Sequence, residues 1–351
     1  MSHYSNSSTA RHGIDSLDPK RYTSSHLLCL CSLLTSTQFS SVENESWLNW
    51  TIWHVHRAIA WFQGSTLPRF VGHNRATLQH LGYLLIEYVE DGVMLSSSWN
   101  DHCEESEKNK NLYSSIAKIM LDLGGIKQPR IGSWTMNDDG NITLTNRPFH
   151  DLTAFWNRHN IPLHLPRGMT YSSADSFLPD LLAYQDVRME HQPNSILDRD
   201  DGVSQLSALV GLRAIFPRLF NARLNRGHFV MNFTDMHQSN IFVDKDWNIT
   251  RLIIDLEFAY SAPIELVHVP AWLTGRGVDQ LYGQNEEPFK LRYDAFVEAV
   301  ADQEKEKQQS DAFSQRLRED WTSGRYWYVL ALDSINAYPS IFNRNLRPQI
   351  I

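Results

Sequence analysis

Hydrophobic and polar positions along the chain predict several amphipathic helices. Between residues 114 and 123, apolar side chains recur from Ile116 to Leu123 at the i, i+3, i+4 and i+7 positions of one helix face, and two glycines follow. A face of this kind is buried when the helix packs on a core. The same period predicts long helices over 171–191, 202–221 and 311–334.

Strand patterns are shorter and cluster in two places. Residues 131–136 and 141–145 flank the sequence Asn-Asp-Asp-Gly, in which the glycine allows the positive φ of a hairpin turn. The other cluster lies around residues 228–255, and the rest of the chain has helical patterns. We therefore predict an α+β protein with a dominant helical part.

A second hairpin is predicted within that later cluster. Residues 241–243 and 249–254 are rich in β-forming side chains, and the loop between them is rich in turn formers. Pairing of these two runs sets residue 240 opposite residue 253 or 254. The side chains at the open end of this hairpin are therefore expected to lie close together.

The first 91 residues divide into a polar start and a more apolar continuation. Residues 1–25 are rich in Ser, Thr, Asn and His and have no hydrophobic period, which is typical of a disordered tail. A helix is predicted over 47–63, and a short buried strand over 84–86. The predicted divisions of the chain are 1–25, 26–91 and 92–351.

Composition and charge restrict the class of protein. Of the 351 residues, 42% are hydrophobic and 21% are charged, as in an ordinary globular protein. The formal charge is −8, and no stretch concentrates Lys and Arg as binding to a nucleic-acid backbone requires. Three cysteines are too few for a disulfide framework, which favours a reducing compartment. The apolar run 27–34 is too short to span a membrane. We predict a cytoplasmic protein that binds neither nucleic acid nor membrane.

Three oxygen-bearing side chains are placed near the open end of the second predicted hairpin. Asn240 and Asp255 stand at this end, with Cβ atoms within about 5–8 Å of each other if the strands pair as expected. Asp235 lies five residues before Asn240, on the loop that leads into the first strand. We therefore predict that two carboxylates and an amide oxygen converge here.

Such a set of hard oxygen ligands suits Mg²⁺, which takes one or two carboxylates together with substrate phosphates. The remaining carboxylate can then accept a proton from an attacking hydroxyl. The pattern Asp-x4-Asn, followed by an Asp on a strand, is the arrangement that supports phosphoryl transfer in kinases. Any one of these residues alone is better explained as a turn cap. The spacing of all three residues together favours a magnesium site over three separate turn caps.

Two segments carry a resemblance to a known family. Residues 234–244 read Thr-Asp-Met-His-Gln-Ser-Asn-Ile-Phe-Val-Asp, and residues 254–259 read Ile-Asp-Leu-Glu-Phe-Ala. They resemble the signature segments of the aminoglycoside phosphotransferase and choline kinase-like family, and more closely those of its fungal members. Weaker likeness extends over about residues 55–350. The resemblance implies a two-lobed protein-kinase-like fold that transfers the γ-phosphate of ATP to a small-molecule hydroxyl.

The resemblance also implies a role for each matched position. Asp235 matches the catalytic base, and Asn240 and Asp255 match the magnesium ligands. ATP is then the co-substrate, and Mg²⁺ the metal cofactor. The hinge that meets adenine matches Glu87, Tyr88 and Val89.

Two further side chains near the signature are candidates for an accessory role. Glu257 lies two residues beyond Asp255 and could support the metal or the substrate. His237 could contact phosphate or substrate, although a surface loop histidine is the simpler interpretation. Phe233 stands where many relatives have a histidine, which is usually a structural brace.

The N-terminal part lacks the residues that hold phosphate in such a fold. Gly13 is the only glycine in the first 63 residues, so no glycine-rich loop is present there. Lys20 is the only lysine in the first 107 residues, and no β-rich run surrounds it. We therefore expect an incomplete N-terminal lobe over 26–91, with its hinge at 87–91, and a large, mostly helical C-terminal lobe.

Three functional hypotheses follow. The leading one is an ATP- and Mg²⁺-dependent phosphotransferase whose partners are a nucleotide and an unknown small-molecule acceptor. The alternative is a catalytically inactive pseudokinase that acts as a binding or scaffold protein, because the N-lobe lysine and glycine-rich loop are not found. A third is a magnesium-dependent hydrolase that uses the same carboxylates. The oligomeric state and the acceptor are left open.

Other noticeable side chains are interpreted mainly as structural. Trp272 and Arg276 could line an acceptor pocket, but a core tryptophan and a solvated arginine are favoured. The charge run 304–309 is interpreted as a solvated helix face or loop. Acids near residue 200 suit a helix N-terminus. The aromatic residues assigned to the core are Trp321, Trp327 and Tyr328.

Overall fold

The computed structural model describes Val55 and residues 92–349, apart from 137–140, 151–160, 163–164, 193 and 253–257. Within these ranges the chain combines helices with short antiparallel sheets, so the α+β prediction is confirmed. Several predictions lie outside the described residues, namely the tail 1–25, most of the helix 47–63, the strand 84–86 and the hinge 87–91.

Eight α-helices are present in the described part of the chain. They are α3 (Leu95–His102), α4 (Ser106–Gly124), α6 (Ala174–His191), α7 (Arg199–Leu219), α8 (Glu286–Glu306), α9 (Ala312–Ser323), α10 (Arg325–Asp333) and α11 (Tyr338–Ile341). Short 3-10 turns connect them, at η4 (Gln238–Asn240), η6 (Ile264–Leu266), η7 (Ala271–Thr274), η8 (Val278–Gln280), η9 (Gly283–Asn285) and η11 (Arg347–Gln349). A π-helical turn, η10 (Phe342–Leu346), follows α11.

The described strands form three small antiparallel sheets. The first has the order β1 (Val93–Met94), β6 (Ile241–Val243) and β7 (Ile249–Leu252). The second has the order β2 (Lys127–Gln128), β5 (Phe229–Phe233) and β8 (Ala259–Pro263). The third is the predicted hairpin of β3 (Ser133–Met136) and β4 (Ile142–Asn146), which is confirmed.

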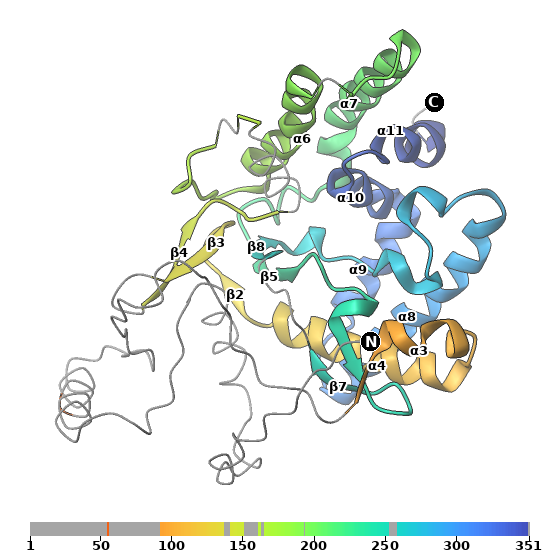
Figure 1. Cartoon of the computed structure of the whole chain (residues 1–351). Helices are drawn as coiled ribbons and strands as arrows, with labels where there is room; N and C mark the ends of the chain where they lie inside the picture. Colours follow the sequence, from red (N-terminus) through yellow and green to blue (C-terminus); the bar gives the residue numbers. More distant parts are fainter. Residues whose placement is uncertain are drawn as a thin grey trace, which may run out of the picture.

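The β2–β5–β8 sheet lies in the middle of the molecule, with helices above and below it in the view of Figure 1. Helix α4 packs along α8, where the rings of Tyr113 and Phe296 lie 5.7 Å apart. Helix α7 packs against α11 and η10, and a Cβ on Gly211 would lie 2.0 Å from the Phe342 ring. Only glycine permits this close approach.

The predicted helix 311–334 is wrong as a single element. It is divided into α9 and α10 at Gly324, whose φ of 80° is left-handed. The Gly324 N–H caps α9 by donating to the carbonyl of Trp321. Apolar periodicity continues across the break, which is why the pattern suggested one helix. The helices predicted over 114–123, 171–191 and 202–221 are confirmed, the last two with bounds shifted by a few residues, whereas α4 begins at Ser106 rather than 114.

Aromatic side chains of α9 and α10 form much of the C-terminal core, as predicted. Trp327 and Tyr328 are buried. Trp321 is only partly buried, and its ring lies 4.8 Å from that of Tyr293 on α8. Ring centroids at this distance add to the stabilisation that comes from burial.

The charge run 304–309 is only partly solvated, and Glu304 contradicts the prediction. This side chain is 2% exposed and accepts hydrogen bonds from the backbone N–H groups of Phe313 and Ser314, at 2.9 and 3.2 Å. These N–H groups belong to the first turn of α9, where no intrahelical acceptor is available. Glu304 therefore caps the next helix, whereas its neighbour Lys305 is exposed as expected.

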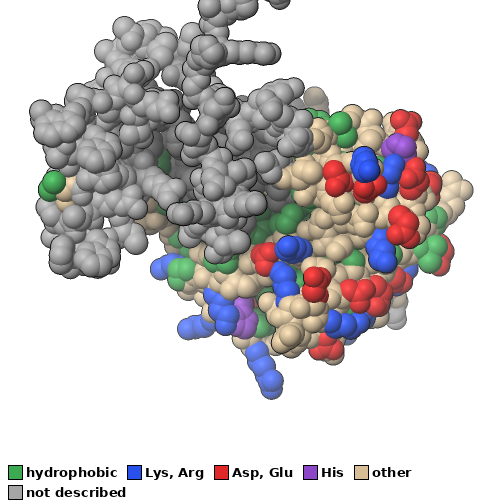
Figure 2. Space-filling model, turned by 90° about the horizontal axis from the view of Figure 1, so that it is seen from below, with side chains coloured by type: hydrophobic (Ala, Val, Ile, Leu, Met, Phe, Trp, Pro, Cys, Tyr) green, Lys and Arg blue, Asp and Glu red, His purple; other side chains and the backbone are tan. Residues whose placement is uncertain are grey.

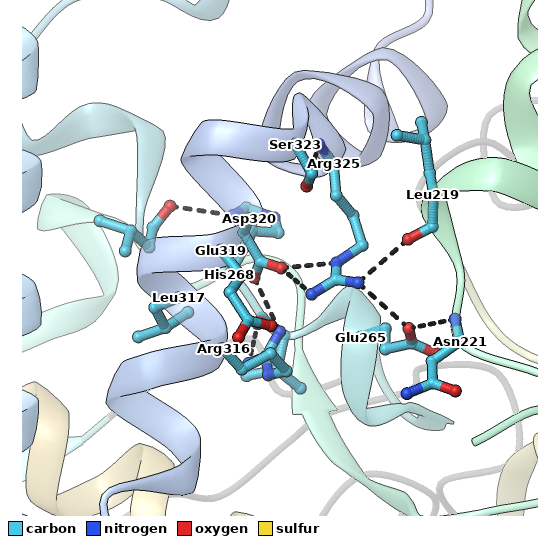
Figure 3. Close-up of polar contacts among 12 residues, drawn as sticks. Leu219, Asn221, Glu265, His268, Arg316, Leu317, Glu319, Asp320, Ser323 and Arg325 are labelled. Carbon is cyan, nitrogen blue, oxygen red and sulfur yellow. Dashed lines mark hydrogen bonds and ion pairs between the residues drawn. The ribbon is translucent and has the colours of Figure 1, made fainter. Parts of the chain in front are cut away.

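A buried charge network fixes the junction of α9 and α10 (Figure 3). Asp320 accepts from Arg316 at 2.8 Å and from Arg325 at 2.5 Å, and Arg325 also lies 3.3 Å from Glu265. Arg325 donates in addition to the carbonyl of Leu219 at the end of α7. Burial raises the pKa of Glu265. The charges of the two arginines thus balance those of the two carboxylates. The network joins the α9–α10 junction to η6 and to the end of α7.

In the view of Figure 2, acidic and basic side chains are interspersed over the right side of the described surface, and several basic side chains project from its lower left edge. None of the helices in the described ranges has the length and apolar character that a membrane span requires.

Candidate functional site

The loop that carries Asp235 connects the two three-stranded sheets. It leaves β5, whose residues Phe229 to Met231 are buried, and enters β6 through the turn η4. Thr234 fixes its start, because the hydroxyl donates to the carbonyl of Phe258 at 3.0 Å. Phe233 packs against an apolar cluster that includes Leu123. The loop therefore starts from a strand whose first three residues are buried and whose last residue packs on an apolar cluster.

Asp235 and Asn240 are held together at this loop. The Asn240 amide donates through Nδ2 to the backbone carbonyl of Asp235 at 2.9 Å and to its carboxylate oxygen Oδ2 at 3.2 Å. Asn240 is buried, whereas the Asp235 side chain is 28% exposed. Because both contacts use the NH₂ group, the amide oxygen of Asn240 faces the other way, and no described residue donates to it.

The hairpin that follows has the predicted register as far as the structure describes it. Ile241 is opposite Leu252, and a bulge lies between Phe242 and Val243. Residue 253, one of the two predicted partners of residue 240, lies outside the described residues. Asp255 and Glu257 themselves lie outside the described residues. Their predicted approach to Asn240 stays a prediction.

The tip of the hairpin is anchored to α3. Trp247 has a φ of 65° in the turn, and its ring stacks on that of Trp99 at 5.4 Å. Its indole N–H donates to Ser98, and Asp244 closes the turn by accepting from the backbone of Asn248. The hairpin is thus fixed at the end distant from Asp235, which leaves the open end to be set by the loop.

His237 contacts the carboxylate of Asp235, a pairing that the sequence analysis did not foresee. Its Nε2 lies 3.4 Å from Asp235 Oδ1, and its Nδ1 accepts from the backbone N–H of Ser239 at 3.2 Å. Because Nδ1 accepts, the neutral imidazole carries its proton on Nε2, which faces the carboxylate. The two-residue spacing on an extended loop was the available signal for this contact.

Trp272 braces the same loop from the side. Its indole Nε1 donates to the carbonyl of Met236 at 2.6 Å. The side-chain amide of Gln238 in turn donates to the backbone carbonyl of Trp272 at 3.4 Å. The ring also meets Trp99 edge-on, 5.7 Å between centroids. The structural interpretation of this tryptophan is therefore favoured, and Arg276 is exposed, as expected of a solvated arginine.

Some of the remaining predicted residues lie within the described ranges and others lie outside them. The acids near residue 200 serve α7, because Asp198 caps it by accepting from the N–H of Asp201 at 2.9 Å. Within the described ranges no three His, Cys, Asp or Glu side chains are grouped as a metal site would require. The predicted positions that lie outside the described residues are Glu87, Tyr88, Val89, Asp255 and Glu257.

A second cluster, of one aspartate and two histidines, lies near the loop of Asp235. Asp333, the last residue of α10, accepts from Nε2 of His150 at 2.9 Å and lies 3.3 Å from Nε2 of His268. His268 also lies 2.9 Å from the carbonyl of Val269 through Nδ1. The three side chains come from segments far apart in the sequence, so no local pattern signalled them.

Comparison with known proteins adds no relative to these observations: no family model, curated protein or solved structure matches this chain.

Proposed function

We propose that this protein is an ATP- and Mg²⁺-dependent phosphotransferase of a two-lobed protein-kinase-like fold, acting on a small-molecule hydroxyl. The observation that supports the proposal is the contact between Asp235 and Asn240 at the open end of the β6–β7 hairpin. The second strand of that hairpin leads directly toward Asp255. This order and spacing are those that phosphoryl transfer uses in kinases.

Asp235 is the proposed general base. Its carboxylate is partly exposed and is oriented by Asn240 on one oxygen, with His237 near the other. A carboxylate fixed in this way can align an acceptor hydroxyl and take up its proton as the phosphoryl group is transferred. The braces on Met236 and Gln238 keep the loop in place during that step.

Asn240 fits a magnesium ligand, because its amide oxygen is turned away from Asp235 and is not used by a described donor. Asp255 is the proposed second ligand, with Glu257 in support. Bound Mg²⁺ neutralises charge on the nucleotide phosphates. Adenine is proposed to bind at Glu87, Tyr88 and Val89.

A pseudokinase that binds a partner without catalysis is the second candidate. The specific observation behind it is the absence of any lysine other than Lys20 from the first 107 residues. A missing charge-assisted contact to phosphate costs about 1.5–3 kcal/mol of binding. Under this alternative the loop of Asp235 is a structural remnant, and nucleotide binding is weak or lost.

Thermal unfolding in the presence of ATP or ADP, each with and without Mg²⁺, separates the two candidates. The phosphotransferase requires a rise in Tm with nucleotide that depends on Mg²⁺. No rise at millimolar nucleotide contradicts it.

Turnover then distinguishes binding from transfer. We expect Asp235→Asn to lower the rate of ATP consumption by about 100- to 10,000-fold, because the base is lost while the side-chain shape is kept. Asp246→Asn is the matched control, since this exposed carboxylate lies at the closed end of the same hairpin. Nucleotide binding without turnover in the unsubstituted protein favours the pseudokinase.

A further inference from the structure

A pocket of about 180 Å³ lies between the end of α4, the strand β5 and the end of α10. Most of its lining is apolar, including Leu123, Met231, Val267 and Leu330. At one side the lining is polar, where His268 and Asp333 reach it. A mainly apolar cavity with a few convergent polar groups is the usual form of a small-molecule site.

The pocket lies behind the loop of Asp235. Thr234 and Met236 line it, whereas the carboxylate of Asp235, between them in sequence, is directed to Asn240 and His237. Asp235 is not among the described lining residues, and the assignment of the pocket does not depend on the proposed phosphoryl transfer.

The size of the pocket limits its occupant. An apolar cavity of about 150 Å³ accommodates benzene in a well-studied protein. A volume of about 180 Å³ thus suits one six-membered ring with a short substituent. Larger, multi-ring molecules do not fit without movement of the walls.

The polar side chains in the described lining include Asn232, Thr234, His268 and Asp333, and the charged acceptor among them is the Asp333 carboxylate. Both nitrogens of His268 face acceptors, namely the Val269 carbonyl and the Asp333 carboxylate, so its two protons are used. His150 uses its Nε2 on the same carboxylate. Each carboxylate oxygen of Asp333 has a further lone pair, and its side chain is 29% exposed.

The charge of this cluster disfavours an ionic ligand. With both nitrogens of His268 protonated, its positive charge offsets the negative charge of Asp333, and His150 contacts the same carboxylate, so these three side chains carry no net negative charge. A cation entering the apolar pocket would lose its hydration without a net negative partner, and an anion would meet the carboxylate. A neutral molecule that donates one hydrogen bond is compatible with both the lining and the charge.

We propose that this pocket binds a small neutral alcohol with a single ring, whose hydroxyl donates to Asp333. The ring would contact the apolar walls, among them Met236 and Trp272, which also belong to the loop and its brace. An occupant therefore restrains the segment next to Asp235.

Three probes of nearly equal shape test the ligand chemistry by NMR titration. Benzyl alcohol is expected to bind with a dissociation constant of about 1 mM or below. Toluene, which lacks the donor, is expected to bind about three- to tenfold more weakly. Benzylammonium is expected to bind most weakly of the three. Equal binding of toluene, tighter binding of the cation, or no binding of benzyl alcohol overturns the proposal.

Methyl labelling of methionine locates the bound probe. Met120, Met231 and Met236 line the pocket, and Met189 on α6 does not. Benzyl alcohol is expected to shift the methyl resonances of the first three and leave that of Met189 unchanged. Shifts confined to other methionines contradict the assignment.

Filling the pocket gives an independent check. Gly124 lines it, and a Cβ added there meets no atom within 4 Å. Gly124→Ala is expected to retain benzyl alcohol binding within about twofold, whereas Gly124→Phe places a ring in the available space and is expected to weaken it at least tenfold. Unchanged affinity in Gly124→Phe, together with unshifted lining methionines, rules the pocket out.

Discussion

Two aspartate–histidine contacts lie near the segment 234–236, and they differ in the burial of their histidines and in origin. Asp235 and His237 are two residues apart, and their side chains are 28% and 40% exposed. Asp333 is similarly exposed, at 29%, but it meets His150 and His268 across 183 and 65 residues of sequence, and these histidines are only 2% and 20% exposed. The first contact follows from local chain geometry, whereas the second requires the folded core.

The two contacts also differ in the partners of their histidines. His237 accepts a backbone hydrogen bond through Nδ1, and its Nε2 lies near the Asp235 carboxylate. Burial opposes the charged form of His268, but Asp333 and the Val269 carbonyl outweigh it and raise the pKa of this imidazole. Burial likewise favours the neutral acid at Asp333, yet the two histidines hold its pKa well below the usual range. The same two residue types thus form a solvent-facing pair in one place and a fixed ionic cluster in the other.

The largest expected effect comes from removing the shared acceptor of the buried cluster. Asp333→Ala leaves two imidazoles without their partner, and we expect the free energy of unfolding to fall by about 2–4 kcal/mol. Asp235→Ala, measured by the same urea titration, is expected to cost only about 1 kcal/mol, because Asn240 keeps its hydrogen bond to the backbone carbonyl of residue 235 and the contact with His237 faces solvent. Equal losses in the two variants would contradict the distinction between the clusters.

The second prediction concerns pH. A raised folded-state pKa means that His268 stabilises the fold below its unfolded value, about 6.5, and that this stabilisation is lost as pH rises through the folded value. The lowered pKa of Asp333 means that its contribution is present above about pH 4 and is lost on acidification. The difference in unfolding free energy between the unsubstituted protein and His268→Gln should therefore be largest near pH 5–6.

We expect that difference to decrease between pH 5.5 and pH 9. The measurement is a set of urea titrations across this range. In an Asp333→Asn background the pH dependence of the difference should disappear, because the pair that causes it is broken. If it persists there, another group is responsible.

Local signals in the sequence predicted most of what the hairpins and helices show. The strands of the β3–β4 pair lie where the sequence predicts them, and the turn formers around Trp247 set the register of the β6–β7 pair. Asp235 and Asn240 meet because only five residues and one 3-10 turn separate them. Period and turn chemistry act over such short distances, so they can be read from the sequence.

Contacts made by packing could not be predicted in this way. Nothing near Asp333 in the sequence indicates His150 or His268, and nothing near Met236 indicates the indole of Trp272. Each depends on how distant segments cover the β2–β5–β8 sheet. The burial of Glu304 inside a charge run has the same cause, because its partners belong to the following helix.

The third prediction tests whether the loop of Asp235 depends on its hydrogen bond from Trp272. Trp272→Phe keeps a ring but removes the donor to the Met236 carbonyl, so we expect a loss of about 0.5–1.5 kcal/mol in unfolding free energy. Amide exchange in the loop around Asp235 should also become faster. Trp247→Phe, which removes the hydrogen bond to Ser98 at the other end of the hairpin, is the control. We expect Trp247→Phe to lose a similar amount of stability without faster amide exchange in the loop of Asp235. Equally fast exchange in this loop in both variants would contradict the role of Trp272.

The smallest effect is expected at His237. Its Nε2 lies 3.4 Å from the Asp235 carboxylate, both side chains contact solvent, and surrounding water replaces the interaction when it is lost. We expect His237→Ala to change the unfolding free energy by less than about 0.5 kcal/mol, and His237→Gln, which keeps a donor, to change it still less. Urea titrations at low and high salt measure both values. A loss above about 1.5 kcal/mol in His237→Ala would show that this exposed pair stabilises the fold as the buried cluster does, because a solvent-facing ion pair contributes no more than about 1 kcal/mol.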